Sequence, residues 1–373
     1  MKILHVVTLL SADGAFGGPA RVALNQASAL KSLGHDVLVV AGTRGYPLSL
    51  EELNGVPVRL FRLSSALGRQ GFAWLYSLQM LVWLRRHRHE FDAIHIHLAR
   101  DLVTLPASLV LLSQDYVAQT HGMIDSPTNP LAKLIDILVR PALRSARVVF
   151  CLTPTEEEDI RAISRGKATV AILPNGVPAS TEKRAPIMAG DVPEVLFLGR
   201  MHSRKRPTLF VEMAGVLHER GVPARFALVG PDEGEAPGVV DLISEMNLHE
   251  SCVWEGAIEA SEVASRIAES AVFVMTAEAE PFGMTILEAM AVHRPVVLSA
   301  TAALAPLISE RRAGVVVIDD PHEYADAVQS LLENRELEIE ITANADRLLT
   351  ERFGMNGVAT TLLSRYRTGD RTN

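Results

Sequence analysis

A repeated alternation of short β-branched segments with stretches of helical periodicity is the feature that most restricts the fold of this chain. Such segments are expected to be buried strands, and strands that alternate with helices form a parallel sheet with helical crossovers. The pattern therefore predicts an α/β protein. The expected strands are 2–8, 36–41, 57–62, 92–97, 116–120, 147–152 and 168–173 in the first half, and 194–199, 224–230, 251–255, 271–275, 295–298 and 314–318 in the second.

The alternation is interrupted at residues 174–193, where four prolines occur and apolar residues are few. A chain of 373 residues is also long for a single hydrophobic core. We therefore expect a first domain at 1–177, a linker at 178–193, a second domain at 194–354, and a final helical segment at 355–373 that is free to pack back against the first domain. Both domains are expected to be Rossmann-like and to face a central cleft, because ligands bind beyond the carboxyl ends of parallel strands.

Composition and charge restrict the partners. The content of 48% hydrophobic and 21% charged residues is typical of a globular protein, and no apolar run reaches the roughly 18 residues that span a bilayer. The first 180 residues carry 18 Lys and Arg against 14 Asp and Glu, whereas the remainder carries 18 against 30. This balance argues against nucleic acid as a partner and leaves an anionic acceptor or a membrane surface for the first half. Two isolated cysteines, Cys151 and Cys252, favour a reducing, cytoplasmic location and are interpreted as buried core thiols.

A glycine-rich turn follows the first expected strand, where DGAFGG at 13–18 leads directly into a helix. In such a junction, backbone N–H groups and the positive end of the helix can approach an anion closely. The glycines at 14, 17 and 18 do not fit the dinucleotide spacing G-x-G-x-x-G. A phosphate site and a simple tight turn are both compatible with this pattern.

Two cations follow the first expected strand of the second half. Gly199-Arg200 ends that strand, and Lys205 lies just before the next helix. A guanidinium and an ammonium group at the carboxyl edge of a sheet are suited to stabilising a nucleoside diphosphate as it leaves. The alternative is a solvated basic turn, and the position at a strand end favours the phosphate interpretation.

The sharpest motif is EPFGMTILEAM at 280–290. Its proline and glycine keep Glu280 on a loop, and Glu288 lies about one turn into the following helix, whose N-terminal amides favour phosphate. The combination is suited to a sugar, a diphosphate and a ribose. Two alternatives remain open, namely that Thr285 and Glu288 form a capping box and that Glu280 is a solvated loop charge.

Over nearly its whole length the chain resembles the retaining glycosyltransferases of family 4, which have the GT-B fold. The resemblance rests on GGPARVALNQASALKSLGHDVLVV, FDAIHIH, Thr120-His121-Gly122 and Pro174-Asn175-Gly176-Val177 in the first half. It rests above all on Gly199-Arg200…Lys205 and on Glu280…Glu288, which is similar to the E-x7-E signature of the family's donor site.

This resemblance implies an enzyme that moves a hexose-type sugar, with retention, from a nucleoside-diphosphate sugar to a hydroxyl group. The acceptor would be a glycan, lipid-linked or small molecule, as in surface polysaccharide biosynthesis, and neither a metal nor another cofactor is expected. By resemblance, Glu280, His121, Arg200 and Lys205 are the catalytic residues, with Glu280 on the sugar and the two cations on the diphosphate. The implied donor-binding residues are Gly17, Gly18, Gly199, Arg200, Lys205, Phe282, Gly283, Met284, Thr285 and Glu288, the last on the ribose.

Two segments qualify this interpretation. Many relatives carry a Gly-Gly pair and a glutamate after the strand at 295–298, where this chain has Ala302-Ala303 and Pro306. The pair His95-x-His97 resembles a metal-binding pair, but no third ligand follows at a suitable spacing. We therefore expect no metal site there.

The apolar stretch 71–84, followed by the basic residues 85–89, has two interpretations. An interfacial helix would provide peripheral contact with the inner face of a membrane. A helix that covers the first sheet, with its basic end at the negative end of the helix dipole, is favoured. Two other functions also remain open: a nucleotide-sugar epimerase on the same fold, and a non-catalytic nucleotide-sugar-binding module.

Overall fold

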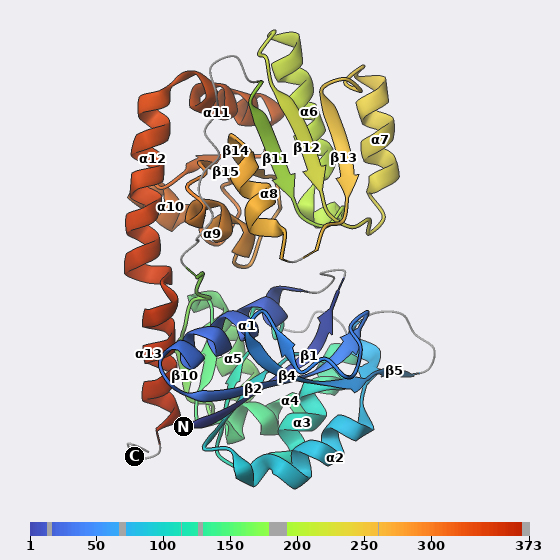
Figure 1. The fold of residues 1–373 in the computed structure, drawn as a ribbon, viewed down its shortest axis with the longest axis vertical. Coiled ribbons are helices and arrows are strands. Elements are labelled where there is room, and N and C mark those ends of the chain that lie inside the picture. The colour runs from blue at the N-terminus through green and yellow to red at the C-terminus, as the bar shows by residue number, and fades with distance from the viewer. Residues whose placement is uncertain are drawn as a thin grey trace. The chain divides into compact units, whose positions relative to one another are not determined.

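The computed structural model describes residues 1–12, 17–66, 72–112, 114–125, 130–178, 192–259 and 261–367. Their contacts divide the chain into two compact units (Figure 1). The first unit is Met1–Gly176 together with Met355–Asn373, and the second is Val177–Gly354. Most of the expected linker, at 179–191, lies outside the described residues.

The first unit is built on an eight-stranded sheet with the order β10-β9-β8-β7-β1-β2-β4-β3. Its neighbouring strands are parallel apart from the short β3–β4 pair at one edge. The strands are β1 (Lys2–Ser11), β2 (Asp36–Arg44), β3 (Glu52–Leu53), β4 (Val56–Arg62), β7 (Ala93–His97), β8 (Tyr116–Gln119), β9 (Val149–Cys151) and β10 (Val170–Ile172).

Helices cover both faces of this sheet, as a parallel sheet requires. One face packs against α1 (Gly17–Ser32) and α13 (Met355–Tyr366), which lie side by side although they come from opposite ends of the chain (Figure 1). The other face packs against α2 (Leu78–His87), α3 (Thr104–Val110), α4 (Pro130–Ser145) and α5 (Pro154–Ser164). Because both faces are covered, β1 is buried continuously over its eight central residues.

The second unit has a six-stranded parallel sheet with the order β13-β12-β11-β14-β15-β16. Its strands are β11 (Glu194–Leu198), β12 (Arg225–Val229), β13 (Cys252–Gly256), β14 (Val272–Met275), β15 (Val296–Ser299) and β16 (Val315–Val317). Its helices are α6 (Pro207–Glu219), α7 (Ala236–Glu245), α8 (Val263–Glu269), α9 (Met284–Ala291), α10 (Ala305–Arg311), α11 (Pro321–Glu333) and α12 (Arg335–Leu348). The thirteen strands expected from the sequence are all present, and the α/β fold class is confirmed.

The apolar stretch 71–84 is not one helix, and that expectation was wrong. Phe72–Trp74 forms a short 3-10 turn, and Leu75–Tyr76 forms β6, which pairs with β5 (Ser64–Ser65). The helix α2 begins only after Ser77, whose hydroxyl accepts a hydrogen bond from the Met80 N–H group at 3.3 Å. A local N-cap therefore divides a segment that looks continuous in hydropathy. The remaining helix covers the sheet, as the favoured interpretation required.

Both cysteines are buried, and burial raises the pKa of each thiol to about 12. They are therefore unreactive core residues at neutral pH. Among the described residues, no helix is both long enough and apolar enough to cross a membrane.

Candidate functional site

The strand order of the second sheet changes direction between β11 and β14, which pair in parallel. Chain connections leave these two strands toward opposite sides, and such a switch point leaves a crevice at the carboxyl ends of the strands. Gly199, Arg200 and Lys205 follow β11, while Glu280 and α9 follow β14. The fold therefore brings the two motifs of the second half to one place, although 75 residues separate Lys205 from Glu280.

Lys205 and Glu280 form an ion pair where these two motifs meet. Lys205 Nζ lies 2.5 Å from Glu280 Oε2, and both side chains are largely shielded from solvent. The other carboxylate oxygen, Oε1, accepts the backbone N–H of Gly283 at 3.2 Å. Glu280 is thus a fixed loop residue and not a solvated charge. The Lys205 ammonium and the Glu280 carboxylate, from segments far apart in the sequence, are thus in direct contact.

The N-terminal end of α9 is open to a ligand. Its N-cap is Gly283, in a left-handed conformation with φ of +75°, and this residue has no side chain to cap the first turn. The positive φ favours glycine at this position, and a β-carbon there would lie 2.7 Å from Ile286 Cδ1, which would have to move. The capping-box alternative for Glu288 is wrong, because Thr285 lies inside the helix and cannot be its N-cap. The first-turn amides can therefore receive an anion.

A second acidic group accompanies Arg200. Arg200 Nη1 contacts Glu233 Oε2 at 2.6 Å, from the loop that follows β12. The two loops approach so closely that a β-carbon on Gly230 would collide with the Gly199 carbonyl oxygen. Sequence reasoning missed Glu233. Its position just after a strand on the same sheet edge is the signal that would have identified it.

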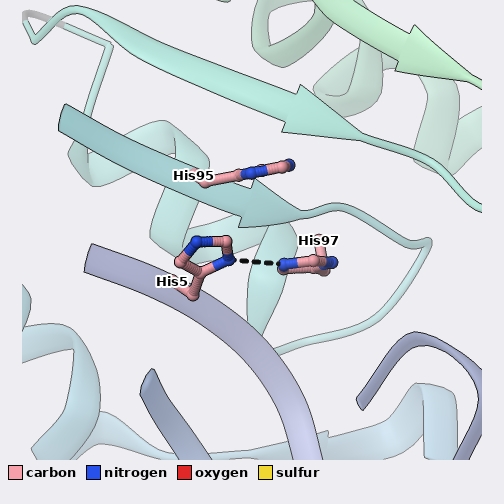
Figure 2. Close-up of side chains that lie close together, drawn as sticks. All are labelled: His5, His95 and His97. Carbon is pink, nitrogen blue, oxygen red and sulfur yellow. Dashed lines mark hydrogen bonds between the residues drawn. The ribbon is translucent and has the colours of Figure 1, made fainter. Parts of the chain in front are cut away.

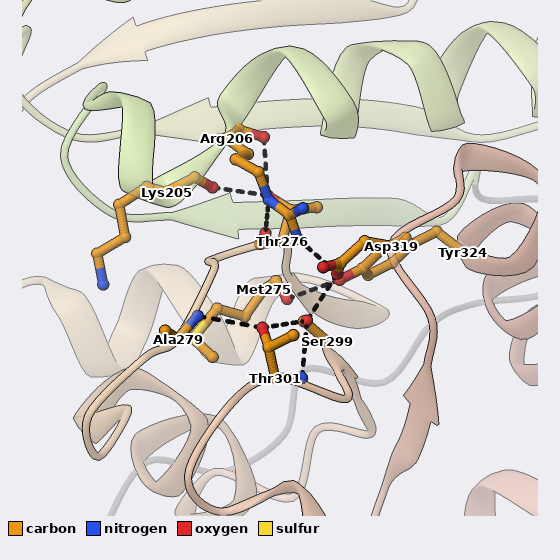
Figure 3. Close-up of polar contacts among 9 residues, drawn as sticks. All are labelled: Lys205, Arg206, Met275, Thr276, Ala279, Ser299, Thr301, Asp319 and Tyr324. Atoms are coloured by element: carbon orange, nitrogen blue, oxygen red, sulfur yellow. Dashed lines mark hydrogen bonds and ion pairs between the residues drawn. The ribbon is translucent and has the colours of Figure 1, made fainter.

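A network of polar contacts holds the Lys205 turn against the loop of Glu280 (Figure 3). Thr276 Oγ1 donates to the carbonyl oxygens of Lys205 and Arg206 at 2.8 and 2.9 Å, and Arg206 Nε donates to the Thr276 carbonyl at 2.8 Å. Arg206 also pairs with Asp319 at 2.5 Å, and Asp319 accepts the Ser299 hydroxyl at 2.6 Å. Burial alone would raise the pKa of Asp319, but the hydrogen bonds from Arg206 and Ser299 lower it below its ordinary value. This network holds the two segments together without the side chains of Lys205 and Glu280.

Backbone strain is concentrated beside the predicted residues. Arg206, next to Lys205, has a φ of +48°, and Ala279, next to Glu280, has a φ of +46°. His121 itself has a φ of +53°. A residue other than glycine is strained at a φ between about +45° and +55°, and strained residues of this kind often occur at functional sites.

The segment that departs from the family pattern still supports the site. The Thr301 hydroxyl accepts the Ala279 N–H at 3.1 Å, and the Ala303 N–H donates to the Glu280 carbonyl at 2.9 Å. Pro306 lies in the first turn of α10. The loop that carries Glu280 is therefore held by these two hydrogen bonds, although the segment has Ala302-Ala303 and Pro306 in place of the family's residues.

The remaining predicted residues belong to the first unit. Gly17 and Gly18 begin α1, and a β-carbon on Gly18 would meet no atom of the described residues within 4 Å. Packing against the described part of the chain therefore does not require glycine at that position. Residues 13–16 of the glycine-rich turn lie outside the described residues.

His121 follows β8 and is held from two sides. On the backbone side, Glu156 Oε1 accepts the Thr120 hydroxyl at 2.5 Å and the Gly122 N–H at 2.6 Å. On the ring side, His121 Nε2 lies 2.7 Å from His97 Nδ1. Glu156 lies in the first turn of α5, whose N-cap is Thr153. Its carboxylate fixes the turn that carries His121.

His95 and His97 are joined by a third imidazole, which the sequence analysis did not anticipate. His5 in β1 is the register partner of His95 in β7, and one nitrogen from each of His5, His95 and His97 lies within 4.8 Å of the others (Figure 2). Three imidazoles match the ligand set of a catalytic zinc site. However, His5 Nδ1 and His97 Nε2 already form a hydrogen bond at 3.0 Å. His5 could not be predicted as a third imidazole, because it meets His95 only through the register of two strands that are distant in sequence.

Two family models match this chain and together span most of it. The model described as "Glycosyl transferases group 1" matches residues 192–334, and the one described as "Glycosyl transferase 4-like domain" matches residues 17–176. The first match contains the whole Lys205–Glu280 crevice. The second contains His121 and both glycines of α1.

Relatives of known function and solved structures agree with these models. The chain is 27% identical over 331 residues to the alpha-D-kanosaminyltransferase of Streptomyces kanamyceticus, over 80% of this chain and 84% of the relative. It is 25% identical over 322 residues to a D-inositol 3-phosphate glycosyltransferase of Corynebacterium urealyticum, over 77% and 74% of the two chains. Its fold is similar to that of Anabaena HepE in complex with UDP and glucose, with a TM-score of 0.75, 18% identity and 98% of each chain covered.

Proposed function

Because the chain belongs to the glycosyltransferases of family 4 and has their GT-B fold, we propose that it transfers a hexose-type sugar from a nucleoside-diphosphate sugar with retention of configuration. The observation that carries this proposal is the Lys205–Glu280 pair at the switch point of the second sheet, beside the uncapped end of α9. A cation, a carboxylate and free helix amides are what a sugar diphosphate needs.

The donor would lie across the carboxyl edge of the second sheet. Its diphosphate would contact Lys205, Arg200 and the first amides of α9, which are positive groups at that edge. Glu280 would accept hydrogen bonds from sugar hydroxyls, and Glu288 would do so from the ribose. HepE, the structural neighbour named above, binds UDP and glucose, which supports a nucleotide sugar as the donor here.

The reaction breaks the bond between the anomeric carbon and the phosphate oxygen and forms a bond from that carbon to the acceptor oxygen. We propose that the acceptor hydroxyl attacks from the face that the phosphate leaves and gives its proton to a phosphate oxygen. Glu280 is engaged by Lys205 and by the Gly283 amide, which favours a role in binding over one as a covalent nucleophile. Lys205 and Arg200 stabilise the charge of the departing diphosphate, so that no metal is needed for this purpose.

Glu288→Gln should weaken donor binding without lowering the melting temperature. The side chain is half-buried in the second turn of α9, whose N-cap is Gly283. Glutamine keeps its size but removes the charge that would accept hydrogen bonds from a ribose, which typically contributes about 1.5–3 kcal/mol. Calorimetric titration with the donor, alongside thermal denaturation, measures both quantities. A loss of stability with unchanged donor affinity would contradict the assignment.

The product linkage should have the anomeric configuration of the donor, and chelation of divalent metals should leave the rate unchanged. Product formed in the presence of EDTA can be analysed by NMR through the coupling of its anomeric proton. An inverted linkage would overturn the retaining mechanism. Activity lost on chelation and restored by one particular metal would overturn the metal-independent one.

A further inference from the structure

A residue with a strained backbone stands next to each member of the Lys205–Glu280 pair. Arg206 follows Lys205 with a φ of +48°, and Ala279 precedes Glu280 with a φ of +46°. A residue with a β-carbon is disfavoured at such a φ, so that each conformation persists only where other contacts hold it in place. The contacts that hold Arg206 and Ala279 therefore also constrain the positions of Lys205 and Glu280.

Asp319 holds the side chain of Arg206. It lies on the loop between β16 and α11, and its Oδ1 is 2.5 Å from Arg206 Nη2 in an ion pair whose side chains are 26% and 23% exposed. The same guanidinium donates through Nε to the Thr276 carbonyl oxygen at 2.8 Å (Figure 3). One branch of contacts therefore runs from Asp319 to the residue beside Lys205.

A second branch runs from Asp319 to the residue beside Glu280. The same oxygen, Asp319 Oδ1, accepts the Ser299 hydroxyl at 2.6 Å (Figure 3). The hydroxyl oxygens of Ser299 and Thr301 lie 2.8 Å apart, and Thr301 Oγ1 accepts the Ala279 N–H at 3.1 Å. A hydroxyl has one proton to donate. Because Ser299 gives its proton to Asp319, Thr301 is the donor between the two hydroxyls, and the whole branch donates toward the carboxylate.

The chemistry of a carboxylate is suited to the end of both branches. An ionised carboxylate only accepts hydrogen bonds, and its charge strengthens those that it accepts. Burial acts to raise the pKa of Asp319, but the hydrogen bonds from Arg206 and Ser299 lower it below its ordinary value. Asp319 is therefore ionised at neutral pH, and one of its oxygens joins the two branches.

We propose that Asp319 is a positioning residue for the Lys205–Glu280 pair. It acts on Lys205 through Arg206, and it acts on Glu280 through Ala279 and the two hydroxyl groups. The inference rests on the proposed function, in which this pair binds the sugar diphosphate. It adds a residue that follows a third strand, β16, to a site formed after β11 and β14.

The kinetic test compares two substitutions of Asp319. Asp319→Ala removes the end of both branches and should lower kcat by about 10- to 100-fold, because a misplacement of about 1 Å in a catalytic group can cost about 100-fold. Asp319→Asn keeps an oxygen that can accept from Arg206 and Ser299, and its kcat should stay within about threefold of the wild type. The KM for the nucleotide sugar should change less than kcat, since Arg200 and the first amides of α9 still bind the diphosphate. The release of nucleoside diphosphate measures both, and a kcat of Asp319→Ala within threefold of the wild type would overturn the inference.

Arg206→Gly provides a rescue test. Glycine adopts a positive φ without strain, so that the turn after Lys205 no longer depends on a contact with Asp319. The double variant Asp319→Ala/Arg206→Gly should therefore recover part of the kcat that Asp319→Ala loses. A double variant no faster than Asp319→Ala would refute the branch through Arg206.

Glu194→Ala is the matched control. It removes an ion pair with Arg266 in the same unit, at 2.6 Å, in which 26% of the carboxylate side chain is exposed, as for Asp319. Glu194 begins β11 and thus lies at the opposite end of this strand from Lys205. Loss of an ion pair should lower the melting temperature of both variants, whereas only Asp319→Ala should lower kcat. An equal loss of kcat in Glu194→Ala would show a general effect on the fold and overturn the inference.

Crystal structures of the wild type and of Asp319→Ala, without ligand, separate the inference from the proposed function. In the variant we expect Arg206 to leave its positive φ and the contact between Lys205 and Glu280 to be lost. Loss of that contact in a protein that transfers no sugar would support the inference and refute the function. An active enzyme whose variant keeps the contact would refute the inference and leave the function standing.

A smaller change decides the question if Asp319→Ala does not fold. Thr301→Val has nearly the same shape but removes the hydroxyl that accepts the Ala279 N–H, and it leaves the pair of Asp319 with Arg206 in place. A displaced Glu280 loop with kcat lowered by about threefold or more would support the inference. An unchanged loop with an unchanged kcat would overturn it.

Discussion

Lys205→Ala should lower the rate of sugar transfer by about 100- to 1000-fold, because one preorganised charge that stabilises a leaving group typically contributes that much. The protein should remain folded. Its turn is held through the backbone carbonyl oxygens of Lys205 and Arg206, which accept from Thr276. The change also leaves the Glu280 carboxylate without its cation, so that it repels the incoming diphosphate. The release of nucleoside diphosphate measures the rate, and thermal denaturation checks the fold.

Two variants control for this loss. Lys205→Arg keeps a positive charge and should recover part of the activity. Arg220→Ala removes an ion pair of 2.6 Å with Asp326 in the same unit, but it lies on α6's C-terminal end, away from the crevice. It should retain full activity. A Lys205→Ala variant within threefold of the wild-type rate would refute the assignment of this ammonium to the leaving group.

The first unit should lose stability steeply between about pH 6 and pH 4. Its buried histidines have folded-state pKa values far below the ordinary 6.5, about 3 for His5 and His121. In this pH range the unfolded chain therefore binds protons that the folded chain does not bind. The free energy of unfolding falls as the pH decreases through this range, and the contribution of these histidines is constant above it. Each of these two histidines lowers the free energy of unfolding by about 1.4 kcal/mol per pH unit below 6.5, so that together they lower it by roughly 5 kcal/mol at pH 4.5, and His95 and His97, whose pKa values burial also lowers, act in the same direction. That is comparable with the whole stability of a domain.

The tryptophans allow this prediction to be measured unit by unit. Trp74 and Trp83 lie in the first unit and Trp254 in the second. Urea unfolding of Trp254→Phe, followed by fluorescence from pH 7.5 to pH 4.5, reports on the first unit alone, and the Trp74→Phe/Trp83→Phe variant reports on the second. The first unit should show the larger slope, and His5→Gln should reduce that slope by about one proton. Equal slopes for the two units would contradict the neutral, buried state of the histidines.

The sequence predicted those features that depend on local pattern. Apolar runs bounded by turns located each strand to within a few residues, as for 36–41 against Asp36–Arg44 in the structure. The placement of Glu280 on a loop and of Glu288 in the following helix was also correct, because the loop ends and the helix begins at Gly283. Periodicity and glycine position are sufficient for such predictions.

Features that depend on pairing between distant segments were not predictable in this way. His5 joins His95 through the register of two parallel strands, and Glu233 meets Arg200 through the close approach of two loops. The division at Ser77 was missed for a different reason, since hydropathy gives a single serine little weight although its hydroxyl caps a helix. In these cases the structure was determined by the positions of hydrogen-bond donors and acceptors more than by hydrophobicity.

The central claim is that the crevice around Lys205 and Glu280 activates a nucleotide sugar. The most direct measurement is the release of nucleoside diphosphate from a panel of nucleotide sugars, with a panel of hydroxyl acceptors, by the wild type and by Lys205→Ala. The account predicts that the wild type turns over one donor and that the variant binds it but turns it over at least about 100-fold more slowly. A wild-type protein that binds a nucleotide sugar without releasing diphosphate, or a variant as fast as the wild type, would contradict it.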